Sequence, residues 1–426
     1  NPMVVPSSTT TPLLRGKRPR TLALACGILA ASGLCFTGLA WGSRPFANSL
    51  GGASAAMRAS SATSRCSSPA SPMTLSRRRA STVTVASSAL EAPPAVTTNI
   101  HDDQLKASGI GTGERRTFRC DVDGRPLEIT YDVFTPKGSS SSSAAPTLFL
   151  ATPSFVPSRA TFADLATAMN KASSGGAAIL TELPGYGLND GTLTDLDAYQ
   201  PRLFRGFLKE FFAHLSSEFQ AGINIVSAGH AAFYALDAVK DSPSDVRSMF
   251  LINPTYRGPL TTIKMKQKDN AFVPALIDGL CGGIAAAYQL PAPLGTAVHA
   301  SQCSEGSIKK AMLSHVYEDP TNVTPQAIEI NRQFAAQGER WGKCAFLVGR
   351  TDPYPRREDA AAAHGSATAV PTAVCVGAKE EEIFKKDLNF LTDNGVPMIV
   401  TPGAQRNFVE YPEQVAKAAQ EFFSKH

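Results

Sequence analysis

The sequence predicts an α/β protein with a mostly parallel central sheet, helices on both faces of the sheet, and an inserted helical lid. From residue 115 onward, short apolar segments alternate with segments of helical spacing. The apolar segments are hydrophobic throughout, which is typical of parallel strands covered on both faces. The alternation stops over 256–364, where only helices and loops are expected, and we interpret this stretch as the lid.

The first part of the predicted core spans residues 115–255. Two alternating segments are separated by Asp121-Val122-Asp123-Gly124, a hairpin signal. The other strands are expected in apolar runs, and the helices where apolar residues recur every three to four positions. The expected strands are 117–120, 127–134, 147–151, 177–183, 223–228 and 249–252, and the expected helices are 158–172, 195–215 and 230–240.

The alternation returns over 365–426, which we expect to complete the sheet. The expected elements are a strand at 372–376, a helix at 381–392, a strand at 397–400 and a last helix at 412–424.

Residues 1–90 have the composition of a targeting region. They contain no Asp or Glu, and their apolar stretch 21–42 follows a basic cluster, as in a secretory signal. The Ser-, Ala- and Arg-rich stretch that follows is typical of a transit peptide, so we expect a plastid protein reached through the secretory pathway. The alternative is a membrane anchor retained at 21–42, which is long enough to span a bilayer. Residues 91–114 are expected to be a polar lead-in.

Charge and cysteine usage exclude several classes of function. Residues 1–90 hold 10 of the 41 Lys and Arg, so the remainder has 31 basic and 36 acidic side chains. This balance predicts no nucleic-acid partner. The five later cysteines are odd in number and widely spaced, which argues against a disulfide framework or a zinc site. We expect buried thiols, no metal and no cofactor; these cysteines are Cys120, Cys281, Cys303, Cys344 and Cys375.

Three motifs occur in a fixed order along the predicted core: PGYGLND at 184–190, LINP at 251–254 and FVEYPEQV at 408–415. In this order they resemble the α/β-hydrolase superfamily over about residues 115–424, in particular the lid-bearing branch with haloalkane dehalogenases and epoxide hydrolases. The segment 314–325 is similar to a lid segment of plant and cyanobacterial plastid-type members that have no established reaction.

The resemblance implies a nucleophile on a strained turn between a strand and a helix. The segment GHAAF at 229–233 follows the expected strand 223–228, and the resemblance places the nucleophile at Ala231. A methyl group cannot attack a carbonyl, an epoxide or a carbon–halogen bond. The catalytic histidine falls on Gln405, which cannot act as a general base near pH 7.

The other implied positions keep little chemistry. Glu380 falls on the acid position, but an acid without its histidine has nothing to orient. The oxyanion hole is expected around Thr152, Ser154 and Ala232, and Pro153 between the first two has no N–H to donate.

Several other residues could carry chemistry or merely pack. His315 in the lid is either an acid/base group or a lid hydrogen bond, and His230 is either catalytic or a packing residue. Ser227 is interpreted as a strand-end hydroxyl, Cys375 as a core residue, and Asp352 as a lid residue that mimics the acid turn.

The sequence therefore predicts a plastid protein that kept the hydrolase pocket and lost its catalytic groups. It would bind an apolar small molecule or dock to a plastid protein partner. The alternative is an active hydrolase of ester, epoxide or carbon–halogen bonds, or a lyase, that uses His315, His230 and Glu380. A third hypothesis is a structural subunit of a plastid membrane complex. The segment 264–288, apolar after a basic start, either packs over the pocket or contacts a membrane surface.

Overall fold

A computed structural model describes residues 99–111, 113–136, 145–154, 156–172, 176–267, 272–291, 294–336, 340–366 and 368–426. The predicted targeting region 1–90, with its alternative anchor at 21–42, lies outside these residues. Within the described ranges, no helix has the length and apolar character needed to cross a membrane.

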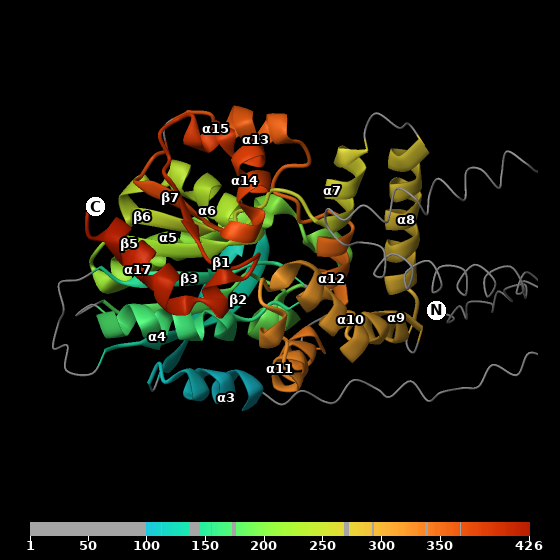
Figure 1. The fold of residues 1–426 in the computed structure, drawn as a ribbon, viewed down its shortest axis with the longest axis horizontal. Coiled ribbons are helices and arrows are strands. Elements are labelled where there is room, and N and C mark those ends of the chain that lie inside the picture. Colours follow the sequence, from blue (N-terminus) through green and yellow to red (C-terminus); the bar gives the residue numbers. More distant parts are fainter. Residues whose placement is uncertain are drawn as a thin grey trace, which may run out of the picture.

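Eight strands form one sheet in the order β1-β2-β4-β3-β5-β6-β7-β8 (Figure 1). Strand β2 pairs antiparallel with β1 and β4, and every other neighbouring pair is parallel. The predicted fold class, an α/β protein with a mostly parallel sheet, is confirmed. The strands are β1 Glu114–Val122, β2 Arg125–Phe134, β3 Thr147–Ala151, β4 Ala178–Glu182, β5 Ile223–Ala228, β6 Val246–Ile252, β7 Thr372–Gly377 and β8 Met398–Thr401.

The hairpin between β1 and β2 turns at Asp123 and Gly124, as its sequence predicts. Both residues have positive φ, 54° and 75°, which matches the two-residue turns that suit the twist of antiparallel strands. The Oδ1 atom of Asp121 accepts a hydrogen bond from the Gly124 N–H at 2.7 Å and fixes the turn.

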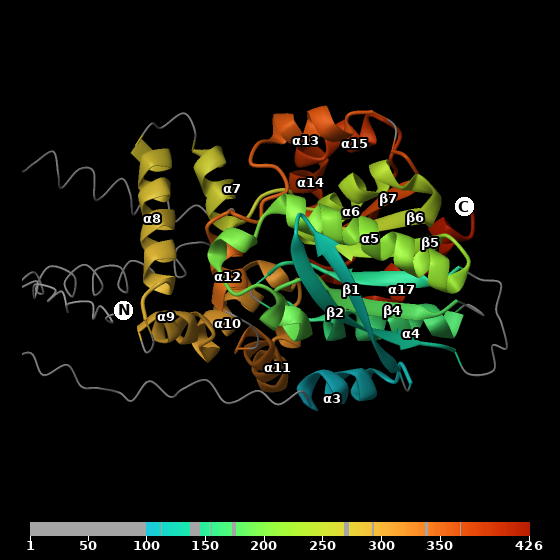
Figure 2. The same cartoon turned by 180° about the vertical axis from the view of Figure 1, so that it is seen from behind.

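Helices cover both faces of the sheet (Figures 1 and 2). The larger helices are α3 Asn99–Ser108, α4 Ala163–Ala172, α5 Pro201–Phe219, α6 Gly229–Asp241, α7 Pro259–Lys266, α8 Phe272–Tyr288, α9 Leu294–Gln302, α10 Glu305–Ala311, α11 Pro325–Ala336, α12 Arg340–Leu347, α13 Arg357–His364, α14 Glu381–Asp387, α15 Asn389–Thr392, α16 Asn407–Glu410 and α17 Pro412–Phe423.

The core consists of two hydrophobic clusters, one on each face of the sheet. Helices α5 and α6 pack on one face, and α4 and α17 pack on the other. Successive residues of β5 divide between them, because Ile225 belongs to the first cluster and Val226 to the second. This two-sided burial explains why the strand is apolar throughout.

The end of the predicted lead-in belongs to the fold. Residues 99–108 form α3, in which His101 and Leu105 are buried. His101 Nδ1 lies 3.2 Å from Ser158 Oγ, and its ring packs against Phe334 at 5.1 Å. The sequence pattern missed this helix because its apolar residues are few and tertiary contacts hold it.

Helices fill the predicted lid, and its described part contains no strand. Helices α7 to α12 lie beyond one end of the sheet, and α8 and α9 project farthest (Figures 1 and 2). Helix α13 instead returns to the sheet and lies beside α15. Its last residue, His364, places Nε2 3.1 Å from Asp237 on α6.

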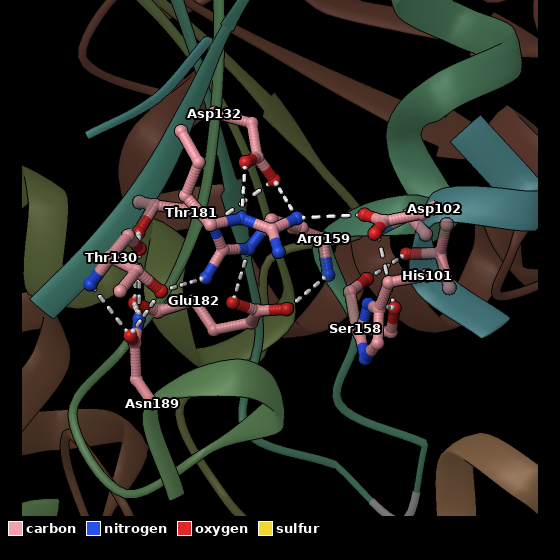
Figure 3. A network of polar contacts seen from close by, with 12 residues as sticks. His101, Asp102, Thr130, Asp132, Ser158, Arg159, Thr181, Glu182 and Asn189 are labelled. Atoms are coloured by element: carbon pink, nitrogen blue, oxygen red, sulfur yellow. Dashed lines mark hydrogen bonds and ion pairs between the residues drawn. The ribbon is translucent and has the colours of Figure 1, made fainter. Parts of the chain in front are cut away.

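A buried ionic network fixes the segment before α4 to the sheet (Figure 3). The side chain of Arg159 is fully buried, and its Nε donates to Glu182 Oε2 at 2.6 Å. Its Nη1 pairs with Asp132 Oδ2 at 3.2 Å, and its Nη2 donates to Thr130 Oγ1 at 2.9 Å. A buried charge is stable only when it is paired and hydrogen-bonded, and this arginine meets both conditions.

Candidate functional site

A cavity of about 180 Å³ lies between the carboxyl ends of the strands and the lid helices. Loops after β3, β5, β6 and β8 form its floor, and residues of α10, α11 and the turn after α10 form its roof. Ligands of open α/β sheets bind outside the carboxyl ends of the strands, so the cavity occupies the expected place.

The turn between β5 and α6 reverses direction at Gly229. Its φ is +54°, whereas Ala228 before it is extended. Glycine adopts this left-handed conformation without the strain that a Cβ atom causes. A Cβ built on Gly229 would lie 2.7 Å from Thr152 Oγ1, so the position is also sterically closed.

The prediction that Ala231 stands at the apex of this turn is wrong. Ala231 is fully buried in α6 and belongs to the α5/α6 core cluster. Ala232 is also fully buried, so its predicted place in the oxyanion hole is wrong as well. The physical reason is backbone conformation: the strained residue of such a turn is the one with positive φ, which here is Gly229.

The backbone N–H of His230, the residue after the apex, is already bound. It donates a hydrogen bond to Thr152 Oγ1 at 3.0 Å. In hydrolases with this turn, the N–H after the nucleophile is one of the oxyanion donors. Ser154 also lines the cavity, and its Oγ accepts a hydrogen bond from the Val156 N–H at 3.2 Å.

The ring of His230, at the floor of the cavity, lies between the hydroxyl of Thr255 and the carboxylate of Asp352. Its Nδ1 lies 2.9 Å from Thr255 Oγ1, and its Nε2 lies 3.4 Å from Asp352 Oδ1. The same Asp352 oxygen accepts a hydrogen bond from the Gly258 N–H at 2.7 Å. Sequence analysis treated Asp352 as a lid mimic of the acid turn and missed Thr255, because 97 residues separate the two.

Gln405 and His315 lie together between two cavities. Both residues line the main cavity and a smaller one of about 30 Å³. The Gln405 N–H points to the His315 carbonyl oxygen at 3.4 Å. Glu380 lines only the smaller cavity, where burial raises the pKa of its carboxyl group. The acid position therefore lies behind Gln405 and outside the main cavity.

The imidazole of His315 is neutral at pH 7. Burial, together with the positive charges of Arg406 and Lys379, lowers its pKa to about 4. Its Nδ1 lies 2.7 Å from Ser314 Oγ. A base of such low pKa abstracts protons poorly near neutral pH.

Asn253 holds the loop that carries Gln405. It follows β6 with a φ of 42°, and its Oδ1 accepts a hydrogen bond from the Gly377 N–H at 3.1 Å. Its Nδ2 donates to the Gln405 carbonyl at 2.9 Å and to Asn407 Oδ1 at 3.1 Å. One uncharged side chain thus connects the ends of β6 and β7 with the loop after β8.

Among the described residues, none of the side chains that line this cavity is a cysteine. None of the five cysteines of the described ranges forms a disulfide, and Cys303, Cys344 and Cys375 are buried. Burial raises the pKa of Cys375, inside β7, to about 11. A thiol of such high pKa is a poor nucleophile.

Helix α8 has an exposed apolar face within the segment 264–288, of which residues 268–271 lie outside the described ranges. Phe272 is 68% exposed and Leu276 is 46% exposed, whereas Ile277 and Ile284 pack inward. The basic start is partly neutralised, because Lys264 Nζ lies 2.6 Å from Asp278 Oδ1.

No protein-family model and no curated protein matches the sequence. Solved structures do match. Rv0554 from Mycobacterium tuberculosis is 16% identical with a TM-score of 0.51, covering 73% of this chain and 99% of its own. An epoxide hydrolase from Vigna radiata is 15% identical with a TM-score of 0.51, covering 74% of this chain and 100% of its own. A thermophilic esterase from Thermogutta terrifontis is 16% identical with a TM-score of 0.50, covering 73% of this chain and 98% of its own.

The chain has the α/β-hydrolase fold. The resemblance drawn from the three sequence motifs is confirmed at this level. In the α/β-hydrolase fold, the nucleophile, the acid and the histidine follow one another along the chain at the carboxyl end of the sheet. In this chain, the loops after β5, β7 and β8 present Gly229, Glu380 and Gln405.

Proposed function

We propose that this α/β-hydrolase-fold protein does not hydrolyse a substrate and instead binds an apolar small molecule in the cavity between sheet and lid. The observation that carries the proposal is the turn after β5. Gly229 at its apex has no side chain, and Thr152 Oγ1 occupies the N–H of His230. The turn lacks a nucleophile, and one oxyanion donor is already engaged.

The walls of the cavity support a binding role. Many of the side chains that line it are aliphatic or aromatic, as is usual in sites for small molecules. These apolar residues are Val156, Phe162, Ile308, Met312, Val316, Phe346, Leu347 and Phe408. Gln405 faces the cavity where a hydrolase needs a general base, and its amide cannot take a proton from water at neutral pH.

A paired assay tests the proposal. The purified chain is assayed for ester and epoxide turnover, and its binding of apolar molecules is followed by displacement of a fluorescent probe. We expect no turnover and displaceable binding. Ala311→Trp, which fills the cavity, should weaken binding at least about tenfold. Leu313→Trp, on the exposed side of the same turn, should leave binding unchanged. Ester or epoxide turnover by the intact protein, or the absence of displaceable binding, would contradict the proposal.

An active hydrolase is the second candidate function, and the Thr255–His230–Asp352 connection favours it. A hydroxyl bound to an imidazole, itself bound to a carboxylate, is the arrangement that activates a nucleophile. Turnover that disappears in Thr255→Val and Asp352→Asn but persists in Thr161→Val, another cavity threonine, would establish this candidate. Turnover lost in Glu380→Ala or His315→Gln would instead favour those two groups.

The proposal includes a plastid location, based on the composition of residues 1–90. Residues 1–90 fused to a fluorescent protein should enter plastids, and residues 43–90 alone should not, because they lack the secretory signal. A fusion retained intact in a membrane fraction would favour the anchor at 21–42. Co-migration of the native protein with a plastid membrane complex would favour a structural subunit, or a partner docked on the lid.

A further inference from the structure

We infer that the ligand of the cavity is an amphipathic carboxylate, and that the guanidinium of Arg406 binds its carboxylate group. This inference rests on the proposed binding function and specifies the chemical class of the ligand. It follows from the charges that line the cavity, from the partners of Arg406 and from the apolar side chains beside it.

The charged side chains that line the cavity are all basic. Arg257, Lys310 and Arg406 belong to its lining, and no Asp or Glu does. Such a lining attracts an anion and repels a cation.

Arg406 has no carboxylate partner within the described ranges, whereas Arg159 has two. The guanidinium of Arg159 contacts two carboxylates, from Asp132 and Glu182 (Figure 3). Arg406 donates from Nη1 to Asn331 Oδ1 at 3.1 Å and from Nη2 to the Val156 carbonyl at 3.3 Å. Both acceptors are uncharged, and no carboxylate of the described ranges lies within ion-pair distance of Arg406. Burial without a counter-charge lowers the pKa of its guanidinium.

The second arginine of the lining has its charge compensated within the protein. Arg257 places Nη2 3.7 Å from Asp387 Oδ2, and its guanidinium lies over the Tyr256 ring at 4.7 Å. Lys310 is exposed at the surface of α10. Arg406 is therefore a half-buried cation of the cavity without a carboxylate partner in the described ranges, and a bound anion would complete its coordination.

Apolar side chains line the cavity together with Arg406. The backbone of Arg406 donates to the Val316 carbonyl at 3.1 Å, and Val316 and Val156 both line the cavity. Phe408 stacks on Phe162 at 4.6 Å, and both rings line the same space. A free inorganic anion would leave these surfaces without a partner, so the site suits a carboxylate on an apolar body.

Matched probes test the inference by calorimetric titration of the intact protein. The probes are decanoate, decanol of the same chain length, and inorganic phosphate. We expect decanoate to bind at least about tenfold more tightly than decanol, because a charge-assisted hydrogen bond is stronger than a neutral one. Arg406→Gln should abolish this preference and leave the affinity for decanol unchanged, whereas Arg257→Gln should keep the preference. Arg406→Lys, which retains the charge, should keep part of it.

The outcomes separate the two proposals. Equal affinity for decanoate and decanol in the wild type would overturn this inference and leave the binding function in place. Loss of the preference in Arg257→Gln but not in Arg406→Gln would also overturn it. Tight binding of phosphate alone would overturn the amphipathic part, and binding of none of the probes would overturn both proposals. Thermal unfolding of each variant verifies folding, and Arg406→Lys serves if Arg406→Gln does not fold.

Discussion

The Oγ1 atom of Thr152 accepts a hydrogen bond from the backbone N–H of His230 at 3.0 Å. This bond joins the loop after β3 to the first turn of α6. The same oxygen also explains why residue 229 is a glycine, because it lies too close to the position that a Cβ of residue 229 would occupy. The absence of a Cβ at Gly229 and the hydroxyl at Thr152 are thus two parts of one local arrangement.

Substitution of Gly229 should reveal this arrangement as an energetic coupling. Gly229→Ala should lower the free energy of unfolding by about 2–4 kcal/mol, from left-handed strain and from the contact with Thr152. In a Thr152→Ala background, the cost should fall to about 1–2 kcal/mol, which is the strain alone. Urea unfolding of the four proteins in a double-mutant cycle measures the coupling.

Gly279→Ala is the matched control for this experiment. Gly279 lies on α8 with open space around its Cα, so alanine should stabilise the helix by about 0.5–1 kcal/mol. An equal cost of Gly229→Ala in both backgrounds would show that the Thr152 hydroxyl does not close the position.

Arg159, which is fully buried, and Arg406, which is half-buried, should respond differently to substitution by glutamine. Arg159→Gln removes the cation that lies between two buried carboxylates; Asp132 keeps its ion pair with Arg115, but Glu182 loses its cation, so the protein should be destabilised by about 3–5 kcal/mol. Arg406→Gln removes a charge that has no described carboxylate partner, and glutamine can still donate a hydrogen bond. Its free energy of unfolding should therefore change by less than about 1 kcal/mol or rise. Unfolding in guanidinium chloride measures the free energy of unfolding of both variants. A similarly large decrease in both would contradict the distinction between the two arginines.

Two histidines, buried His299 and half-buried His315, should make the free energy of unfolding fall in mild acid. Burial lowers the pKa of His299 to about 3, and that of His315 to about 4. Below about pH 6.5 the unfolded chain protonates these side chains while the folded protein does not. Their contribution is therefore complete above that pH and is lost as the pH falls toward 3–4.

The slope of stability against pH measures this contribution. For His315 the full effect is roughly 3 kcal/mol. His315→Gln should flatten the curve between pH 6.5 and 4, and His426→Gln at the exposed C-terminus is the control. A curve of unchanged slope in His315→Gln would contradict the assignment.

The exposed face of α8 should matter for surfaces and not for folding. Phe272→Ser and Leu276→Ser replace exposed side chains and should change the free energy of unfolding by less than about 0.5 kcal/mol. If the segment 264–288 contacts a membrane, both variants should weaken sedimentation with phosphatidylglycerol vesicles. Ile277→Ser, on the buried face, should instead destabilise the protein. Wild-type protein that does not sediment with the vesicles would contradict the contact.

Local signals in the sequence were sufficient for most of the sheet. Strands β3 and β5 match the expected ranges residue for residue, because each is an apolar run between turn residues. The helix expected at 195–215 instead runs over Pro201–Phe219, and its first turn contains Pro201. Proline at the first helical position is a start signal that could have corrected the boundary.

The site was harder to predict because its relations are long-range. The sequence analysis matched Gly229 to the first glycine of the nucleophile motif, two positions before the nucleophile. The backbone instead places Gly229 at the apex of the turn, where the nucleophile would stand. The contact between His230 and Asp352 joins residues 122 positions apart, and no local pattern reports it. Whether an arginine such as Arg406 has a carboxylate partner likewise depends on how distant segments pack.

Under the proposed binding function, the wall shared by the two cavities would limit the length of the ligand. Four residues line both spaces and so belong to the wall between them: Thr255, Arg257, His315 and Gln405. Gln405 is half-buried and is held through its backbone, which leaves its side chain able to rotate. Rotation of that one amide would extend the pocket toward Glu380 without any movement of the sheet. Ligands of increasing chain length could then share one binding mode, with the added methylene groups in the smaller cavity beyond Gln405.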